Sequence, residues 1–143
     1  MKHAAGILFV LDSTPKKVLL VHPTNAAWFG TYGPPKGMMD DDELQSEGAV
    51  RETFEEIGIK VSQDSLSDMF TINYDKNGSV YKKVYVYVLH IKKIEELGLT
   101  SESLSKNQLQ IEEVDHAQFF EEDEARKRAF RRFIPLLDYV FTK

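Results

Sequence analysis

The sequence predicts an α+β fold in which a mixed β-sheet lies between helices, an α/β/α sandwich formed by one domain over residues 1–143. Three observations favour this fold. A chain of 143 residues with 42% hydrophobic residues can bury one compact core. Short β-rich runs occur on both sides of a central helical segment, and a second helical segment closes the chain. Strands before and after a helix favour a sheet that is covered by helices on its faces.

The first elements along the chain are two short strands. The β-rich runs 4–11 and 18–21 are separated by DSTPKK, whose turn-forming residues predict a strand pair. Residues 22–36 contain too many glycines and prolines for regular structure and are expected to form a surface loop. Three aromatic side chains fall in this loop: Trp28, Phe29 and Tyr32. These rings predict either a platform for a ligand or a cover for the core, and both interpretations stay open.

The central helix is predicted over residues 44–57. Three apolar residues recur at spacings of four and three and predict one buried stripe: Val50, Phe54 and Ile57. Gly58 follows as a glycine that ends a helix. Gly48 lies inside the helix, where glycine costs up to about 1 kcal/mol relative to alanine, and the sequence offers no reason for it.

A second strand pair follows the helix, over residues 70–74 and 83–91. The DKNGS stretch between them contains Asn-Gly, which is a strong hairpin signal. In the second strand the valines alternate with Tyr85 and Tyr87. One face is therefore expected to meet the core while the other presents tyrosines.

The last third of the chain predicts a loop, a strand and a helix. Residues 95–110 are polar and weakly periodic, and a weak strand is expected within 111–120. The segment 122–141 is predicted to form an amphipathic helix that Pro135 kinks or divides.

Composition excludes several kinds of site. The chain has no cysteine, which rules out disulfides, thiolate catalysis and cysteine-based zinc sites. A net charge of −5 argues against a surface that attracts nucleic acid as a whole, so an acidic chain that handles phosphates needs a cation. The apolar run at the start is too short to span a bilayer, and a cytoplasmic protein without membrane association is expected. The four histidines are not at metal-site spacing and are expected to lie at the surface or to form hydrogen bonds.

Three glutamates of the central helix form an acidic cluster. Glu52, Glu55 and Glu56 stand at i, i+3 and i+4, so they project from one face of a helix, opposite to the predicted apolar stripe. Such clusters are usually solvated faces. Carboxylate oxygens also select magnesium, calcium or manganese over zinc or copper, and magnesium sites commonly include substrate phosphates. The spacing alone leaves both readings open.

The surrounding residues resemble the box of the Nudix hydrolase family, which reads G-x5-E-x7-R-E-U-x-E-E-x-G-U, where U is a bulky aliphatic residue. Every fixed position has its match in this chain: Gly37, Glu43, Arg51, Glu52, Glu55, Glu56, Gly58 and Ile59. The departure is Thr53, which stands at an aliphatic position. Its hydroxyl needs a partner if it is buried.

The resemblance implies a nucleotide pyrophosphohydrolase that uses Mg²⁺, or Mn²⁺ in its place. By resemblance, the metal ligands are Glu52, Glu55 and Glu56, with the Gly37 carbonyl as a further ligand. A water activated by the metal attacks phosphorus in this chemistry.

Further catalytic roles are carried over by the same resemblance. Glu43 and Arg51 match an orienting carboxylate and its ion-pair partner. The general base is expected among Glu56, Glu112 and Glu113, and Glu113 matches the carboxylate that other family members place on a later loop.

Three local features resemble the branch of asymmetrical diadenosine tetraphosphate hydrolases, which implies a dinucleoside polyphosphate as the small-molecule substrate. These are the AAGILF opening, PPKG before the box and the RET-x-EE-x-GI ending that contains Thr53. Tyr32 in place of a tryptophan and the MMDDD sequence depart from that branch. Rings for stacking and lysines for phosphates give the substrate-contact candidates: Tyr32, Lys36, Lys83, Tyr85 and Tyr87.

Other functions remain open at this stage. An RNA 5′-end or cap pyrophosphohydrolase would use the basic run on the last helix: Arg126, Lys127, Arg128, Arg131 and Arg132. ADP-ribose or a nucleotide sugar is another possible substrate. A non-catalytic Nudix-fold regulator is the alternative from a different class, although such a module would be expected to lose box glutamates. The sequence makes no prediction of oligomeric state.

Overall fold

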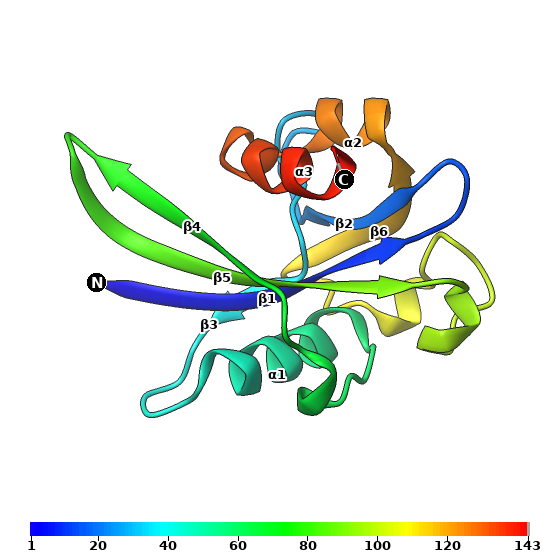
Figure 1. The fold of residues 1–143 in the computed structure, drawn as a ribbon, viewed down its shortest axis with the longest axis horizontal. Helices are drawn as coiled ribbons and strands as arrows, with labels where there is room; N and C mark the ends of the chain where they lie inside the picture. The colour runs from blue at the N-terminus through cyan, green and yellow to red at the C-terminus, as the bar shows by residue number, and fades with distance from the viewer. Residues whose placement is uncertain (143) are drawn as a thin grey trace.

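A computed structural model describes residues 1–142 of the chain. The described residues form one six-stranded sheet: β1 (Lys2–Leu11), β2 (Lys17–Pro23), β3 (Lys36–Met38), β4 (Met69–Lys76), β5 (Ser79–Ile91) and β6 (Val114–Glu121). The α-helices are α1 (Gln45–Ile57), α2 (Glu122–Arg128) and α3 (Ile134–Phe141). Helix α1 covers one face of the sheet, and α2 and α3 cover the other (Figure 1). The predicted α/β/α sandwich is confirmed.

The sheet is mixed and has the strand order β4-β5-β1-β2-β6, with β3 paired to β1. Strands β1 and β5 run parallel, whereas β1 with β2, β2 with β6 and β4 with β5 are antiparallel. Every residue of β1 from Ala4 to Leu11 is buried. A central strand of this kind is covered on both faces and therefore reads as a continuous apolar run.

The sheet splits between β1 and β2. These strands pair only at their far ends, where Val10 faces Val18. Nearer the start of β1, residues 33–38 lie between the two strands. Gly33 exchanges hydrogen bonds with Val21 of β2, and β3 pairs with β1. The PPKG stretch is thereby fixed in the middle of the sheet rather than in a free surface loop.

Gly6 permits this close approach. The Ile7 N–H donates to the Pro35 carbonyl over 3.2 Å, and a Cβ on Gly6 would lie 2.1 Å from that same oxygen. No side chain larger than hydrogen fits at such a distance. The glycine of the AAGILF opening thus has a packing role next to PPKG.

The buried face of α1 differs from the predicted stripe. Phe54 is 50% exposed and Val50 is only half-buried, so the prediction was wrong at these two positions. Five residues of α1 are buried and form the face that packs on the sheet: Gly48, Ala49, Thr53, Glu56 and Ile57. A count of large apolar residues cannot find a helix face that contains small residues and a buried carboxylate.

The loop before α1 explains Gly48. A Cβ at this position would lie 3.1 Å from both Met39 Cγ and Glu43 Oε1. The glycine lets residues 39–43 pack closely over the first turn of the helix. Its cost in helix propensity is therefore balanced by the placement of the Glu43 carboxylate.

Thr53 gives a prediction about stability. Its side chain is fully buried, and within residues 1–142 no hydrogen-bond partner reaches its Oγ1. Thr53→Val keeps the shape and removes the unsatisfied hydroxyl, so we expect the free energy of unfolding to rise by about 1 kcal/mol. Urea denaturation measures this change. Thr53→Ser keeps the hydroxyl but loses the methyl group, and it should lower the free energy of unfolding. A Thr53→Val variant that is less stable than the parent would contradict the prediction.

The hairpin forms as predicted, whereas the C-terminal helix is interrupted over residues 129–133 and not at Pro135, as the sequence had suggested. Asn77 and Gly78 have φ angles of 52° and 81°, as a tight turn between β4 and β5 requires. The predicted last helix is divided into α2 and α3, with Pro135 in the first turn of α3, where a missing N–H costs nothing. Within residues 1–142, none of the helices has the length and apolar character needed to cross a membrane.

Candidate active site

A cavity of about 450 Å³ opens at the split in the sheet, within the size range of small-molecule sites. Both strands of the split, the PPKG stretch, α1 and the turn before β6 contribute to it. Its walls have these polar and charged side chains: Thr31, Lys36, Glu52, Glu55, Glu56, Lys82, Gln110 and Glu113. A charged cavity of this kind suits a phosphorylated ligand and a cation.

The three box glutamates form one wall of this cavity. They differ in depth, because Glu56 is only 8% exposed whereas the side chain of Glu55 is 42% exposed. Glu56 Oε1 accepts a hydrogen bond of 3.3 Å from the Lys36 N–H, which ties the PPKG stretch to α1. The helix therefore presents carboxylates from the core to the rim.

Burial raises the pKa of Glu56 to about 7. The Lys36 charge and N–H oppose this shift, while the nearby carboxylates of Glu52 and Glu113 add to it. Burial likewise raises the pKa of Glu52. Carboxylates in such surroundings are costly to ionise unless a cation lies beside them.

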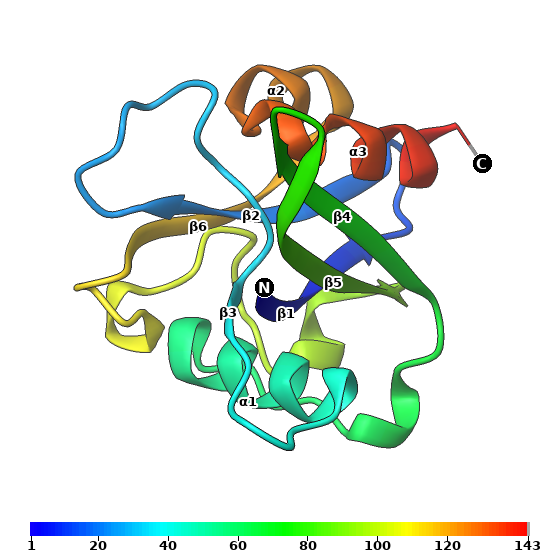
Figure 2. The ribbon, with the colours of Figure 1, turned by 90° about the vertical axis from the view of Figure 1, so that its left-hand side faces the viewer.

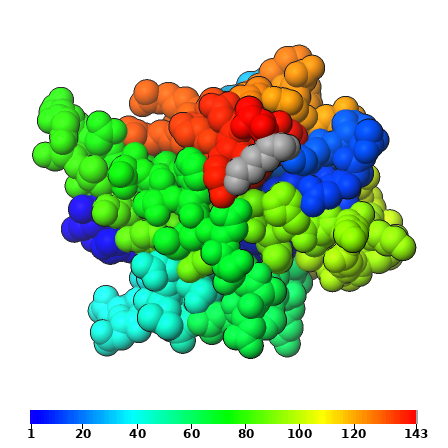
Figure 3. Space-filling view, viewed as in Figure 1, coloured from blue at the N-terminus to red at the C-terminus, as the bar shows by residue number. Residues whose placement is uncertain are grey.

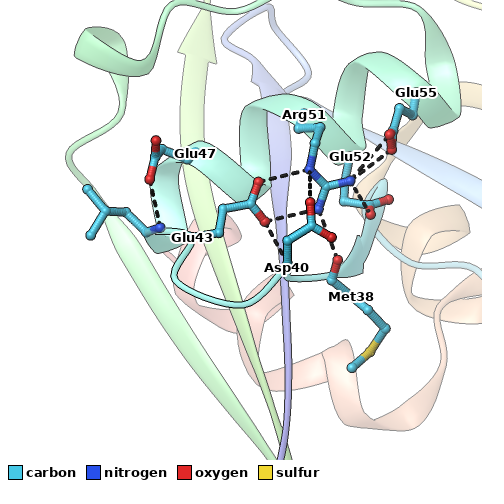
Figure 4. Close-up of polar contacts among 8 residues, drawn as sticks. Met38, Asp40, Glu43, Glu47, Arg51, Glu52 and Glu55 are labelled. Atoms are coloured by element: carbon cyan, nitrogen blue, oxygen red, sulfur yellow. Dashed lines mark hydrogen bonds and ion pairs between the residues drawn. The ribbon is translucent and has the colours of Figure 1, made fainter.

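Arg51 organises the same helix face (Figure 4). Its Nε and Nη2 donate to the two carboxylate oxygens of Glu43 over 2.8 and 3.0 Å. Its Nη1 donates to Glu52 and Glu55 over 2.9 and 2.8 Å. Among residues 1–142, no group of three or more His, Asp or Glu side chains is arranged around a point that suits a metal. A cation would replace the Nη1 contacts, while the fork to Glu43 keeps the guanidinium in position.

Gly37 leaves room for the Glu52 carboxylate. A Cβ on Gly37 would lie 1.9 Å from Glu52 Oε2, so any other residue would displace that carboxylate. The carboxylate oxygens of the α1 glutamates therefore face the backbone of Gly37, where no side chain intervenes. This donor set fits Mg²⁺ or Mn²⁺.

Two lysines line the cavity, and only one of them is a lysine that the sequence predicted for the site. Lys36 and Lys82 contribute to the walls, whereas Lys83 points to the other side of β5, as neighbours in a strand do. Lys82 Nζ lies 5.1 Å from the centre of the Tyr74 ring, and burial lowers the pKa of this lysine. A signal for Lys82 was available, because it shares its strand face with the buried Val84.

The tyrosines proposed as stacking platforms lie elsewhere. Tyr32 is 1% exposed and packs against His22 and Phe120, so its ring is not accessible to a ligand and the expected contact is wrong. Tyr85 and Tyr87 are half-buried on the side of the sheet that α1 covers, where they pack against the core. Their alternation with valines reflects sheet packing on both faces.

The turn before β6 brings one of two neighbouring glutamates to the site. Glu113 lines the cavity, whereas Glu112 is an exposed residue of the same turn outside it. The Gln110 N–H donates to the Glu56 carbonyl over 2.9 Å, which fixes the turn to the end of α1. Of the two later-loop candidates, Glu113 is the one placed beside the box.

Three arginines of the basic run, which lies on α2 and the turn after it, are engaged in ion pairs. Arg126 contacts Glu122 and Asp138, and Arg128 contacts Glu124. Arg132 likewise pairs with Asp75 of β4. These partners neutralise much of the positive charge that an RNA backbone would need.

The Arg51–Glu43 fork predicts how stability depends on pH. Its hydrogen bonds hold the pKa of Glu43 below the usual value. A lowered folded-state pKa contributes stability that is present above the unfolded pKa, about 4.3, and is lost as pH falls through the folded pKa. We expect Glu43→Gln to lower the Tm of the metal-free protein at neutral pH and the difference to close in acid. Thermal melts over a pH series measure it, and a constant difference down to about pH 3 would contradict the prediction.

We compared the chain with protein families and with solved structures. A family model described as NUDIX domain matches residues 1–138. A search of curated proteins gave no match. Similar solved structures include C. elegans Ap4A hydrolase, with a TM-score of 0.68 and 22% identity over 99% of this chain and 96% of that one. The NUDIX domain of Shewanella oneidensis NrtR, solved with ADP ribose, has a TM-score of 0.68 and 16% identity over 95% and 83%. A NUDIX hydrolase from Nitrosomonas europaea gives 0.63 and 22% over 96% and 69%.

At these identities the structural likeness shows the shared fold, whereas the family match extends over nearly the whole chain. The box residues that carry the resemblance extend from β3 through the following loop and α1 to the residues just after it, and three of its glutamates line the cavity. The chain belongs to the NUDIX domain family.

Proposed function

We propose that this protein is a Mg²⁺-dependent pyrophosphohydrolase of dinucleoside polyphosphates such as diadenosine tetraphosphate. The observation that carries the proposal is the cavity at the sheet split, in which four carboxylates and two lysines meet. Carboxylates suit a divalent cation, and lysines suit the charge of a polyphosphate.

The cation would be held by Glu52, Glu55 and Glu56, with the Gly37 backbone beside them. Bound Mg²⁺ supplies charge neutralisation on the bridging phosphates and makes a nearby water more acidic. Arg51 keeps its fork to Glu43 and so orients the helix face from outside the donor set.

In this proposal Glu113 acts as the general base. It lines the cavity from the opposite element, the turn before β6, and is not part of the proposed donor set on α1. The proton that leaves the attacking water passes to its carboxylate, while Lys36 and Lys82 hold the phosphates in place as point charges.

The neighbouring glutamates allow a matched test of this role. We expect Glu113→Gln to lower kcat by about 10²-fold, since general-base catalysis contributes at least that much. Glu112→Gln makes the same chemical change one residue away, outside the cavity. Steady-state kinetics with Mg²⁺ decides the assignment, and an equal or larger loss in the Glu112 variant would overturn it.

The choice of a dinucleoside polyphosphate rests on the AAGILF, PPKG and RET-x-EE-x-GI stretches. The structure of C. elegans Ap4A hydrolase is similar over almost the full length of both chains. ADP-ribose is the second candidate, because the similar NrtR domain was solved with ADP ribose. The ion pairs of Arg126, Arg128 and Arg132 argue against RNA.

A substrate panel with product chromatography in oxygen-labelled water tests the proposal. The panel contains diadenosine tetraphosphate, ADP-ribose and capped RNA, each with Mg²⁺. We expect ATP and AMP from the first substrate at the highest kcat/KM, and the position of the label identifies the phosphorus attacked. Preferential formation of AMP and ribose 5-phosphate from ADP-ribose would overturn the substrate assignment.

A further inference from the structure

The loop between β2 and β3, whose second half lines the cavity, carries two exposed aromatic rings. Trp28 is 53% exposed and Phe29 is 59% exposed. The loop stands out beyond the end of β2 (Figure 2). Both of its ends belong to the cavity wall, because the flanking residues Pro23 and Lys36 line the cavity, as does Thr31 within the loop. The space-filling view in Figure 3 shows the opposite side of the molecule, where α3 and the β4–β5 hairpin form the surface.

A buried histidine fixes the Trp28 ring. The rings of His22 and Trp28 stack with centroids 4.1 Å apart and planes 9° from parallel. His22 itself is 1% exposed, with Nδ1 2.5 Å from Asp115 Oδ1 and Nε2 2.9 Å from the Ala27 carbonyl oxygen. The His22 ring therefore covers one face of the Trp28 indole. The solvent-exposed surface of Trp28 is the opposite face and the edge of its ring.

The rest of the loop is held against α2. The Gly30 N–H donates to the Lys127 carbonyl over 3.1 Å, and the Thr31 hydroxyl donates to the Ala27 carbonyl. The Arg128 guanidinium lies 4.5 Å from the centre of the Phe29 ring. Single exposed apolar side chains need no explanation, but here two adjacent rings are each backed by a fixed partner. Little conformational entropy is lost when a ligand stacks on rings that are already held.

We propose that the open face of Trp28 binds a purine base of the substrate whose phosphates occupy the cavity. This inference rests on the proposed function, since it requires a substrate that carries a base. A nucleobase is a flat aromatic ligand that stacks on tryptophan, and each such contact contributes about 10-fold or more to binding. Trp28 is thus a specificity residue, in place of the buried Tyr32.

The parent protein offers a direct test, because Trp28 is the one tryptophan in the sequence. Its fluorescence is excited at the red edge of its absorption, where adenine absorbs little, and is followed during titration with ATP or tripolyphosphate in Mg²⁺. We expect saturable quenching by ATP and not by tripolyphosphate. Equal responses to the two ligands, or none to ATP, would overturn the proposal.

Variants separate stacking from structure. Trp28→Ala is expected to raise the Kd for ATP about 10-fold in calorimetry, with tripolyphosphate binding unchanged, while Trp28→Phe keeps a ring and most of the affinity. Phe54→Ala is the matched control, since Phe54 is 50% exposed and lies outside the cavity wall. ATP affinity that is the same in Trp28→Ala as in the parent contradicts the proposal.

The fluorescence titration and the hydrolysis assay test the role of Trp28 and the proposed function separately. Hydrolysis of diadenosine tetraphosphate without a fluorescence change by ATP would leave the function standing and remove the role of Trp28. Quenching by ATP with a Trp28-dependent Kd, but without hydrolysis of that substrate, would leave the base site standing and remove the proposed substrate.

Discussion

Glu56→Gln is expected to lower kcat by about 10³-fold while the protein stays folded, because the proposed buried metal ligand is replaced by a neutral isostere. Glu56 is the deepest of the three box carboxylates in the cavity wall. The amide keeps the shape and one acceptor oxygen but removes the negative charge. Because ionising a buried carboxylate is costly, the same change should maintain or raise the Tm of the metal-free protein.

A control on the same helix makes this result specific. Glu47→Gln keeps the acceptor for the Leu44 N–H at the start of α1, and Glu47 is exposed. We expect parental kcat and KM for this variant. Loss of activity in Glu56→Gln together with a lowered Tm would indicate damage to the fold and would contradict the assigned role.

Gly37→Ala is the second change with a large expected effect. The added Cβ would lie within 2.8 Å of both carboxylate oxygens of Glu52, and the carboxylate is the free end of a flexible side chain. It therefore moves instead of the backbone, so the free energy of unfolding changes little. Misplacement of a catalytic group by about 1 Å costs about 10²-fold in rate, which is the loss of kcat we expect.

A double-mutant cycle shows whether this effect passes through Glu52. If Gly37→Ala acts by displacing that carboxylate, it should cause little further loss of kcat in a Glu52→Ala background. Additive losses would mean that Gly37 acts by another route, such as the backbone of β3. Melting curves of the three variants give the accompanying changes in stability.

Much of the fold was predictable because local signals and tertiary contacts agree. The Asn-Gly turn, the glycine after α1 and the run of buried residues in β1 each have the conformation that their chemistry favours. The box could be identified because its glutamates have a fixed helical spacing. Their common place on the cavity wall follows from that spacing once α1 packs on the sheet.

Other features depend on contacts that the sequence does not display. The stripe assigned to Phe54 failed because Ala49 and Glu56 occupy the face that meets the sheet. Lys83 was named as a phosphate contact, but it is the neighbouring Lys82 that shares the face of the buried valines on β5 and lines the cavity. Tyr32 was proposed as a substrate contact, yet its ring is buried against His22 and Phe120 although much of its loop is exposed.

In the proposed function the carboxylates of α1 hold the divalent cation that hydrolysis requires. The most direct measurement is the turnover of diadenosine tetraphosphate by the parent and by Glu56→Gln, with Mg²⁺ and after removal of the metal by a chelator. We expect ATP and AMP from the parent only when Mg²⁺ is present, and almost none from the variant. Equal product from both proteins, or undiminished product from the parent without a divalent cation, would contradict it.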